Sequence, residues 1–268
     1  MSQITIQNLN FTYDGDHTPV FEALNLQLDT HWKLGLVGRN GRGKTTLLRL
    51  LAGELKGRGT VSLRQPCLRW PKPAADPSRR TLDILLEGVP PEDEWKICRE
   101  LSLLGLSEEI LDRPFSTLSG GEQTRALLAA LFLDEGAYPM IDEPTNHLDG
   151  PGRALVAGYL KSLDRGFLLV SHDRAFLDGC VDHILALNPT GPELVRGTFS
   201  SWFRAGGTPD LRVVGQGGTD QIRLQKLRSA ARPGIYRPQV GQDDAAGQEY
   251  RGPPAAGDSG EVRLAQGH

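Results

Sequence analysis

The stretch "LGLVGRNGRGKTTLLRLLAG", residues 34–53, constrains the fold of this chain more than any other. An apolar, strand-like run leads into a glycine-rich loop, and leucines at helical spacing follow that loop. Gly38, four further residues and then Gly43, Lys44 and Thr45 match the phosphate-loop pattern in its required strand–loop–helix context. The alternative, a chance glycine-rich turn before a helix, explains neither flank. The sequence therefore predicts a nucleotide site on an α/β fold.

The chemistry of a phosphate loop assigns roles to its residues. Glycines let backbone N–H groups turn toward the phosphates, and the N-terminus of the following helix adds its positive dipole. We expect Lys44 to reach the β- and γ-phosphates and the Thr45 hydroxyl to ligate Mg²⁺. The residues expected to hold the nucleotide in this loop are Gly38, Asn40, Gly41, Gly43, Lys44, Thr45 and Thr46.

Acidic residues end another strand-like run, in "AYPMIDEPTNHLD" at residues 137–149. Asp142 is placed to hold Mg²⁺, and Glu143 to orient or deprotonate an attacking water. Taken alone, this pair could equally be a solvated acidic turn before a proline. His172 follows a further apolar run, "FLLVS". A lone histidine there is usually a surface residue, but beside the other motifs a γ-phosphate sensor is the better interpretation.

The remaining sequence limits the classes of protein to which this chain can belong. Strand-like and helix-like runs alternate up to about Phe203, which predicts an α/β domain with a largely parallel sheet. No run approaches the roughly 18 apolar residues of a membrane span, and the N-terminus lacks a signal-peptide pattern. The three cysteines are scattered without metal or disulfide spacing, which favours the reducing cytoplasm. A net charge of −3 gives no basic footprint for nucleic acid.

Taken together, the motifs resemble the ATP-binding cassette superfamily over residues 2–203. The resemblance implies a P-loop NTPase fold with a mixed sheet core and a small helical subdomain, with ATP and Mg²⁺ as cofactors. It implies that Glu143 and His172 are catalytic and that Thr45 and Asp142 bind the metal. It further implies that Tyr13, otherwise a strand-end surface tyrosine, stacks on adenine.

The exact residues within these motifs indicate one branch of the superfamily. "DEPTNHLD" and "SHDRAFLD" look like the ABC-F proteins, which act on ribosomes and contain no transmembrane part. "MSQITIQNLNFTYDG" and "GRNGRGKTT" are similar to the branch that protects ribosomes from antibiotics. The resemblance therefore implies the first cassette of an antibiotic-resistance ribosomal protection protein.

The segment Ser119–Glu122 corresponds to the signature motif of that superfamily, in which Ser119, Gly120 and Gly121 contact nucleotide. The same residues also form a capping box, which exposes a helix N-terminus. In the superfamily this motif completes the nucleotide site of a different cassette, and ABC-F proteins carry that second cassette in the same chain. Because one P-loop and one signature motif occur here, we expect the partner to be a missing C-terminal half or a second copy of this chain.

One family position departs from the pattern. The superfamily usually places a glutamine after the strand that follows the first helix. By spacing, this position falls near "RWPKP", where Lys72 stands, whereas Gln65 lies earlier. Which of the two occupies the position stays open, so coupling or turnover can be altered. Hydrolysis need not be lost, because charge neutralisation and Glu143 remain.

Residues 204–268 form a separate region in the sequence. They hold 12 Gly, 5 Pro and only two aromatics, so we expect a mostly disordered tail after a cassette domain at 1–203. Two interpretations stay open: a genuine tail, or a reading-frame shift after Phe203. One codon choice for Ala205–Gln221, read one base later, gives a charged, helix-prone segment. The tail carries +2 and the cassette −5, which leaves contact with rRNA largely to a linker and second half.

Three functions remain in view from the sequence. The leading one is an ABC-F-type ATPase in which ATP-driven cassette pairing acts on the ribosome, with the activity of this single-cassette chain left open. A transporter's nucleotide-binding subunit, which would also lack membrane spans, is the second. The third is an inactive, truncated fragment that binds ATP without turning it over.

Overall fold

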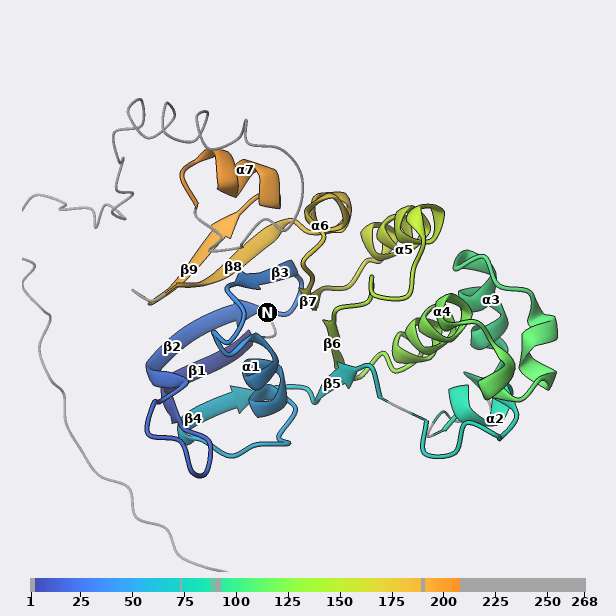
Figure 1. The fold of residues 1–268 in the computed structure, drawn as a ribbon, viewed down its shortest axis with the longest axis horizontal. Helices are drawn as coiled ribbons and strands as arrows, with labels where there is room; N and C mark the ends of the chain where they lie inside the picture. Colours follow the sequence, from blue (N-terminus) through green and yellow to red (C-terminus); the bar gives the residue numbers. More distant parts are fainter. Residues whose placement is uncertain (1–2, 73, 88, 90–92, 189–190, 208–268) are drawn as a thin grey trace, which may run out of the picture. The chain divides into compact units, whose positions relative to one another are not determined.

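The computed structural model describes residues 3–72, 74–87, 89, 93–188 and 191–207 (Figure 1). A three-stranded antiparallel sheet has the order β2-β1-β4, formed by β1 (Gln3–Phe11), β2 (Phe21–Asp29) and β4 (Arg58–Leu63). The register of β1 shifts after Ile6, where Asn8 adopts a left-handed backbone with φ 50°. Such a bulge changes the phase of the strand. Leu9 therefore returns to the buried side that Ile6 occupies.

A six-stranded sheet carries the order β5-β6-β7-β3-β8-β9. Its strands are β3 (Lys33–Gly38), β5 (Cys67–Trp70), β6 (Tyr138–Asp142), β7 (Phe167–Val170), β8 (His183–Asn188) and β9 (Gly191–Arg196). All neighbours are parallel except β8 and β9, which are antiparallel. The predicted α/β fold with a mixed sheet core is confirmed. Because β6, β7 and β3 are adjacent and parallel, the loops that follow them meet at one edge.

The helices divide into two groups in Figure 1. Helix α1 (Lys44–Leu51) follows β3 directly and lies beside the antiparallel sheet. The predicted helical subdomain gathers beside β5 and consists of α2 (Thr81–Leu85), α3 (Trp95–Leu103), the short helices η2 (Glu108–Asp112) and η3 (Phe115–Thr117), and α4 (Gly120–Leu131). The remaining helices are α5 (Gly150–Ser162), α6 (Arg174–Cys180) and α7 (Phe199–Arg204).

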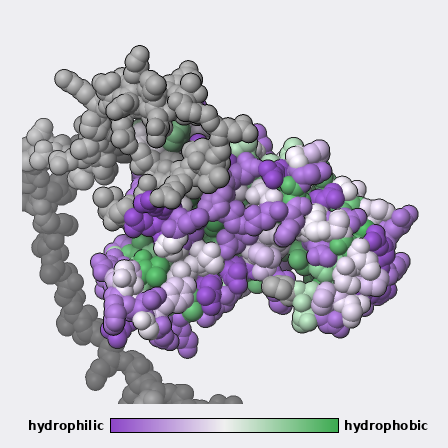
Figure 2. Space-filling view, viewed as in Figure 1, coloured by the Kyte–Doolittle hydropathy of each residue, from purple (hydrophilic) through white to green (hydrophobic). Residues whose placement is uncertain are grey.

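Two hydrophobic cores lie on opposite faces of the six-stranded sheet. Side chains of β7 alternate between them: Phe167 and Leu169 join the core under α5 and α6, whereas Leu168 and Val170 join the core with α1 and the antiparallel sheet. Burial on both faces explains why the strands are continuously apolar in sequence. The outer surface is mainly hydrophilic on the face shown in Figure 2.

Helix α7 ends at Arg204, one residue beyond the predicted domain boundary. Most of the predicted tail at 204–268 lies outside the described residues, so the boundary and the disorder stay predictions. In the part of the chain that the structure describes, no helix is long and apolar enough to cross a membrane.

Candidate functional site

The predicted phosphate loop leaves the C-terminal end of β3 and enters α1. Gly38, Gly41 and Gly43 all have positive φ, at 153°, 80° and 88°, which is a backbone region that favours glycine. The sequence needs glycine at Gly43 for a second reason. A β-carbon there would lie 2.6 Å from Val20 Cγ1 and 2.8 Å from Phe21 Cζ. The loop is therefore both turned inward and packed against the start of β2.

Lys44 is the first residue of α1 and is only 9% exposed. Its ammonium donates to the carbonyls of Gly38 at 2.9 Å and Arg39 at 3.3 Å, so the side chain curls back over the loop. Burial lowers the pKa of Lys44, while Glu143 and Asp142 act in the opposite direction. A buried cation in a glycine-rich loop at a helix N-terminus is suited to binding a phosphate chain. Asn40, also expected in the site, is exposed on the same loop.

The predicted metal ligands are brought together across the sheet edge. Thr45 Oγ1 donates to Asp142 Oδ2 at 3.1 Å, although the residues are 97 positions apart. Among the described residues, no group of three or more His, Cys, Asp or Glu could hold a metal. Mg²⁺ usually keeps several waters and binds through one or two carboxylates plus substrate phosphates. A hydroxyl paired with a single carboxylate beside a phosphate loop therefore fits magnesium delivered with a nucleotide.

Glu143 occupies a strained and partly enclosed position. Its φ of 54° is left-handed, which costs a non-glycine residue about 1–2 kcal/mol, and strain of this kind gathers at functional sites. The Glu143 N–H donates to the Val170 carbonyl at 2.9 Å. Oε2 accepts from the backbone N–H of His172 at 3.2 Å. Oε1 lies 3.2 Å from His172 Nε2 without hydrogen-bond alignment, and it is buried with no donor among the described residues.

Burial, modified by the neighbouring charges, sets the pKa of this carboxyl group. Burial raises the pKa of Glu143 to about 7, and Asp142 adds to the rise, whereas the His172 backbone N–H and Lys44 oppose it. Burial lowers the pKa of His172, and Lys44 adds to that effect while Asp142 opposes it. A carboxyl group whose pKa lies near neutrality can accept a proton and remain ionised for part of the time. The pair is therefore suited to general-base chemistry.

The predicted signature segment lies in the helical subdomain. Ser119 Oγ accepts from the Glu122 N–H at 3.3 Å, and Glu122 Oε2 accepts from the Ser119 N–H at 2.8 Å, so the capping box is present. A β-carbon at Gly120 would lie 3.4 Å from His147 Cβ, and one at Gly121 would lie 3.2 Å from the His147 carbonyl oxygen. The predicted helix N-terminus is formed, and Figure 1 places α4 with α2 and α3, apart from α1.

Comparison with known proteins identifies this arrangement. Residues 21–146 match the ABC transporter family. ABC transporter F family member 2 of Arabidopsis thaliana is 30% identical over 200 residues, which covers 71% of this chain and 29% of that protein. Protein GCN20 of Saccharomyces cerevisiae is 31% identical over 188 residues, which covers 68% of this chain and 25% of that protein. The chain carries an ABC-F ATP-binding cassette.

The fold agrees with this assignment. A solved nucleotide-free ATP-binding cassette from an ABC transporter matches with a TM-score of 0.64 at 17% identity, covering 74% of this chain and 92% of that one. The cassette belongs to a family of ATPases and spans 25% to 29% of the length of the two curated relatives. The activities and partners of these longer proteins therefore apply to this chain only as proposals.

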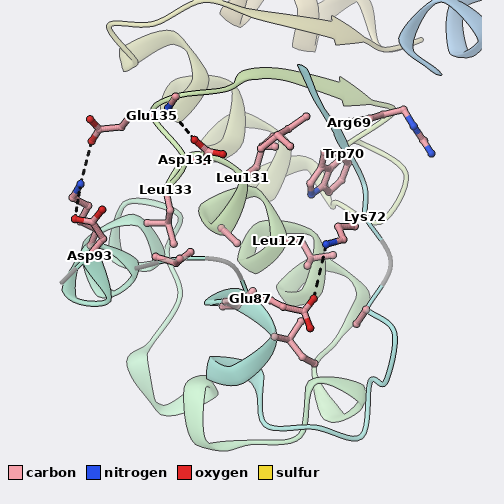
Figure 3. Close-up of a pocket in the computed structure, with 18 residues that line it drawn as sticks. Arg69, Trp70, Lys72, Glu87, Asp93, Leu127, Leu131, Leu133, Asp134 and Glu135 are labelled. Atoms are coloured by element: carbon pink, nitrogen blue, oxygen red, sulfur yellow. Dashed lines mark hydrogen bonds and ion pairs between the residues drawn. The ribbon is translucent and has the colours of Figure 1, made fainter. Parts of the chain in front are cut away.

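The two candidates for the glutamine position lie beyond opposite ends of β5. Gln65 precedes β5, whereas Lys72 follows it, on the same side as the loops after the parallel neighbours β6 and β7. The Lys72 side chain is 82% exposed, and its ammonium lies 3.9 Å from Glu87 Oε2. The side chains of Lys72 and Glu87 line a cavity of about 620 Å³ between β5, α2 and α4. Trp70 and Leu127 also line this cavity (Figure 3). Because Gln65 follows β4 and Lys72 follows β5, which of the two takes the family's glutamine position stays a prediction.

Several contacts of the site were not visible in the sequence. Tyr13 is half-buried, and its hydroxyl lies 3.0 Å from Thr46 Oγ1 in the phosphate loop, although the two residues are far apart in the sequence. His147 packs on the signature glycines Gly120 and Gly121, a contact that its own motif does not indicate. No local sequence signal marks either contact, because each joins segments that meet only in the folded chain.

Proposed function

We propose that the cassette binds ATP with Mg²⁺ and hydrolyses it as one half of a pair, and that this pairing acts on the ribosome. The observation that carries the proposal is the environment of Glu143. One carboxylate oxygen is held by the His172 backbone, while the other is buried without a donor and faces the same histidine ring. Because no described residue donates to this oxygen, its lone pairs can accept a proton from a water that reaches it.

The other residues take complementary roles in this proposal. Lys44 and the backbone of Gly41 and Gly43 neutralise the phosphates, which stabilises charge that develops during phosphoryl transfer. Thr45 and Asp142 would hold the Mg²⁺, which supplies further neutralisation of phosphate charge when bound. The Glu143 carboxylate takes the proton of the attacking water.

Pairing follows from the position of the signature segment. Gly120 and Gly121 begin helix α4 within the helical subdomain, so their N–H groups are available to the γ-phosphate of an opposing cassette, while Ser119 caps this helix end. His172 senses the γ-phosphate of its own site. The partner is a second cassette, which is either a different cassette or a second copy of this chain.

Glu143→Gln tests the catalytic assignment. ATP turnover should fall at least about 100-fold, the usual contribution of a general base, while ATP binding and ATP-dependent pairing persist. Glu54→Gln is the matched control, since Glu54 pairs with Arg69 outside the site and should keep wild-type turnover. Phosphate release would be measured over a range of protein concentrations. Wild-type turnover in Glu143→Gln would refute the role of Glu143.

The concentration series also separates the partner hypotheses. Turnover that rises faster than linearly with protein concentration indicates a pair formed by two copies. Tight ATP binding without turnover at any concentration in the wild-type chain would identify an ATP-binding fragment that needs its missing half.

The ribosomal step rests on the likeness to ABC-F proteins and has its own test. Glu143→Gln with ATP should sediment with ribosomes, and the wild-type chain with ADP should not. The cassette carries a net charge of −5, so we expect this binding to weaken strongly with salt unless a linker and second half are supplied. Recovery of a membrane permease instead of ribosomes would favour a transporter subunit. We propose protection of ribosomes from antibiotics as the outcome of this binding when two cassettes are paired.

A further inference from the structure

The phosphate loop carries two adjacent threonines whose hydroxyl groups serve different sides of the site. Thr45 Oγ1 donates to Asp142 at 3.1 Å, at the metal side. Thr46 Oγ1 lies 3.0 Å from the Tyr13 hydroxyl, on the antiparallel sheet. Consecutive residues of an α-helix point about 100° apart, so one side chain cannot replace the other. The first turn of α1 therefore joins two segments that are remote in sequence.

The Tyr13 ring is fixed from several directions. Phe11 meets it edge to face, with ring centroids 4.9 Å apart and planes at 85°. Val20 and Phe21, at the end of the loop that carries Tyr13, pack directly over Gly43. The Thr46 side chain is buried at 7% exposure, so the bond from Tyr13 reaches an enclosed hydroxyl. Tyr13 is thus attached to the phosphate loop by a hydrogen bond, and Val20 and Phe21 pack the end of its own loop against Gly43.

We infer that Thr46 is a positioning residue for base recognition, which acts by holding Tyr13 through this hydrogen bond. The inference rests on the proposed role of Tyr13 in stacking on adenine. Phosphate binding fixes the loop and α1, and the bond carries that fixed position to the aromatic ring. The consequence is a base-dependent contribution to affinity that needs both hydroxyl groups.

Isothermal titration of the full chain with ATP and with inorganic tripolyphosphate, both with Mg²⁺, tests the inference. Thr46→Val keeps the shape of the side chain and removes its hydroxyl, while Tyr13→Phe removes the other hydroxyl without changing α1. Each should weaken ATP binding about two- to tenfold more than it weakens tripolyphosphate binding, because one hydrogen bond contributes about that much and the bond to Tyr13 matters only when a base is present. The double variant should be no weaker than either single variant, and Thr46→Ser should restore affinity.

The possible outcomes distinguish a failure of the positioning role of Thr46 from a failure of the proposed stacking role of Tyr13. If Thr46→Val weakens tripolyphosphate as much as ATP, the hydroxyl serves the phosphates and the inference is wrong. Additive effects of the two variants would overturn it as well. Tyr13→Ala provides the remaining control: if it leaves the ratio of ATP to tripolyphosphate affinity unchanged, the stacking role in the proposed function fails. If Tyr13→Ala changes that ratio and Thr46→Val does not, the positioning role alone fails.

Discussion

Replacement of Gly43 by alanine tests the geometry of the phosphate loop most directly. An alanine there would keep a left-handed φ of 88°, at a cost of about 1–2 kcal/mol. Its β-carbon would also meet Val20 Cγ1 at 2.6 Å and Phe21 Cζ at 2.8 Å. Overpacking of a core by one methyl group adds about 1–3 kcal/mol. Together the two effects predict a loss of about 2–5 kcal/mol in the free energy of unfolding.

Two other glycines supply matched controls for the backbone contribution. Gly41 in the same loop and Gly53 after α1 have φ of 80° and 75°, and neither has a neighbour within 4 Å of an added β-carbon. Their alanine variants should therefore lose only the backbone contribution of about 1–2 kcal/mol. In a domain of this size, 1 kcal/mol lowers Tm by about 2–4 °C.

Thermal unfolding of the three variants without nucleotide gives the comparison. Gly43→Ala should unfold several degrees below both controls, and it should also lose ATP affinity, because Val20 and Phe21 can yield only by moving away from the loop. Equal Tm values for Gly43→Ala and Gly41→Ala would refute the packing argument. They would leave only the backbone requirement at Gly43.

Three further predictions concern other parts of the cassette. Ser119→Ala should destabilise the protein by about 1 kcal/mol in denaturant unfolding, because α4 loses its cap from Ser119 to Glu122. Glu143 has a pKa raised from 4.5 to about 7, so its charged form is disfavoured in the folded state, and stability falls as the pH rises from the lower value through the higher one. Nucleotide-free Glu143→Gln should thus be more stable than wild type at pH 8, by about 1–2 kcal/mol after allowance for partial exposure, and the gap in Tm should narrow toward pH 5. Tyr159→Phe removes the 2.6 Å hydrogen bond to buried Glu100 and should cost about 1–3 kcal/mol in urea unfolding; no change in the midpoint would contradict this account.

The local parts of the site were predictable from the sequence because each motif is contiguous. Glycines at fixed spacing between a strand and a helix predict a phosphate loop, and the positive φ of Gly38 and Gly41 agrees with that reading. The capping box from Ser119 to Glu122 was likewise readable, since its partners are three residues apart and bond within one helical turn. In both cases the chain itself brings the groups together.

The strand topology decided where the other candidate residues lie relative to the site. The sequence left both Gln65 and Lys72 as candidates for one position, and only the parallel pairing of β5 with β6 placed Lys72 on the side of the site.

The amino-acid sequence by itself thus determined which residues can do phosphate chemistry, because their spacing along one strand, loop or helix suffices. Tertiary structure alone decided how Thr45 reaches Asp142 across 97 residues and Thr46 reaches Tyr13 across 33. Such contacts form only when strands pair and two cores close on either side of one sheet. Their physical cause is the shared burial of distant segments, which leaves no periodic trace in either segment.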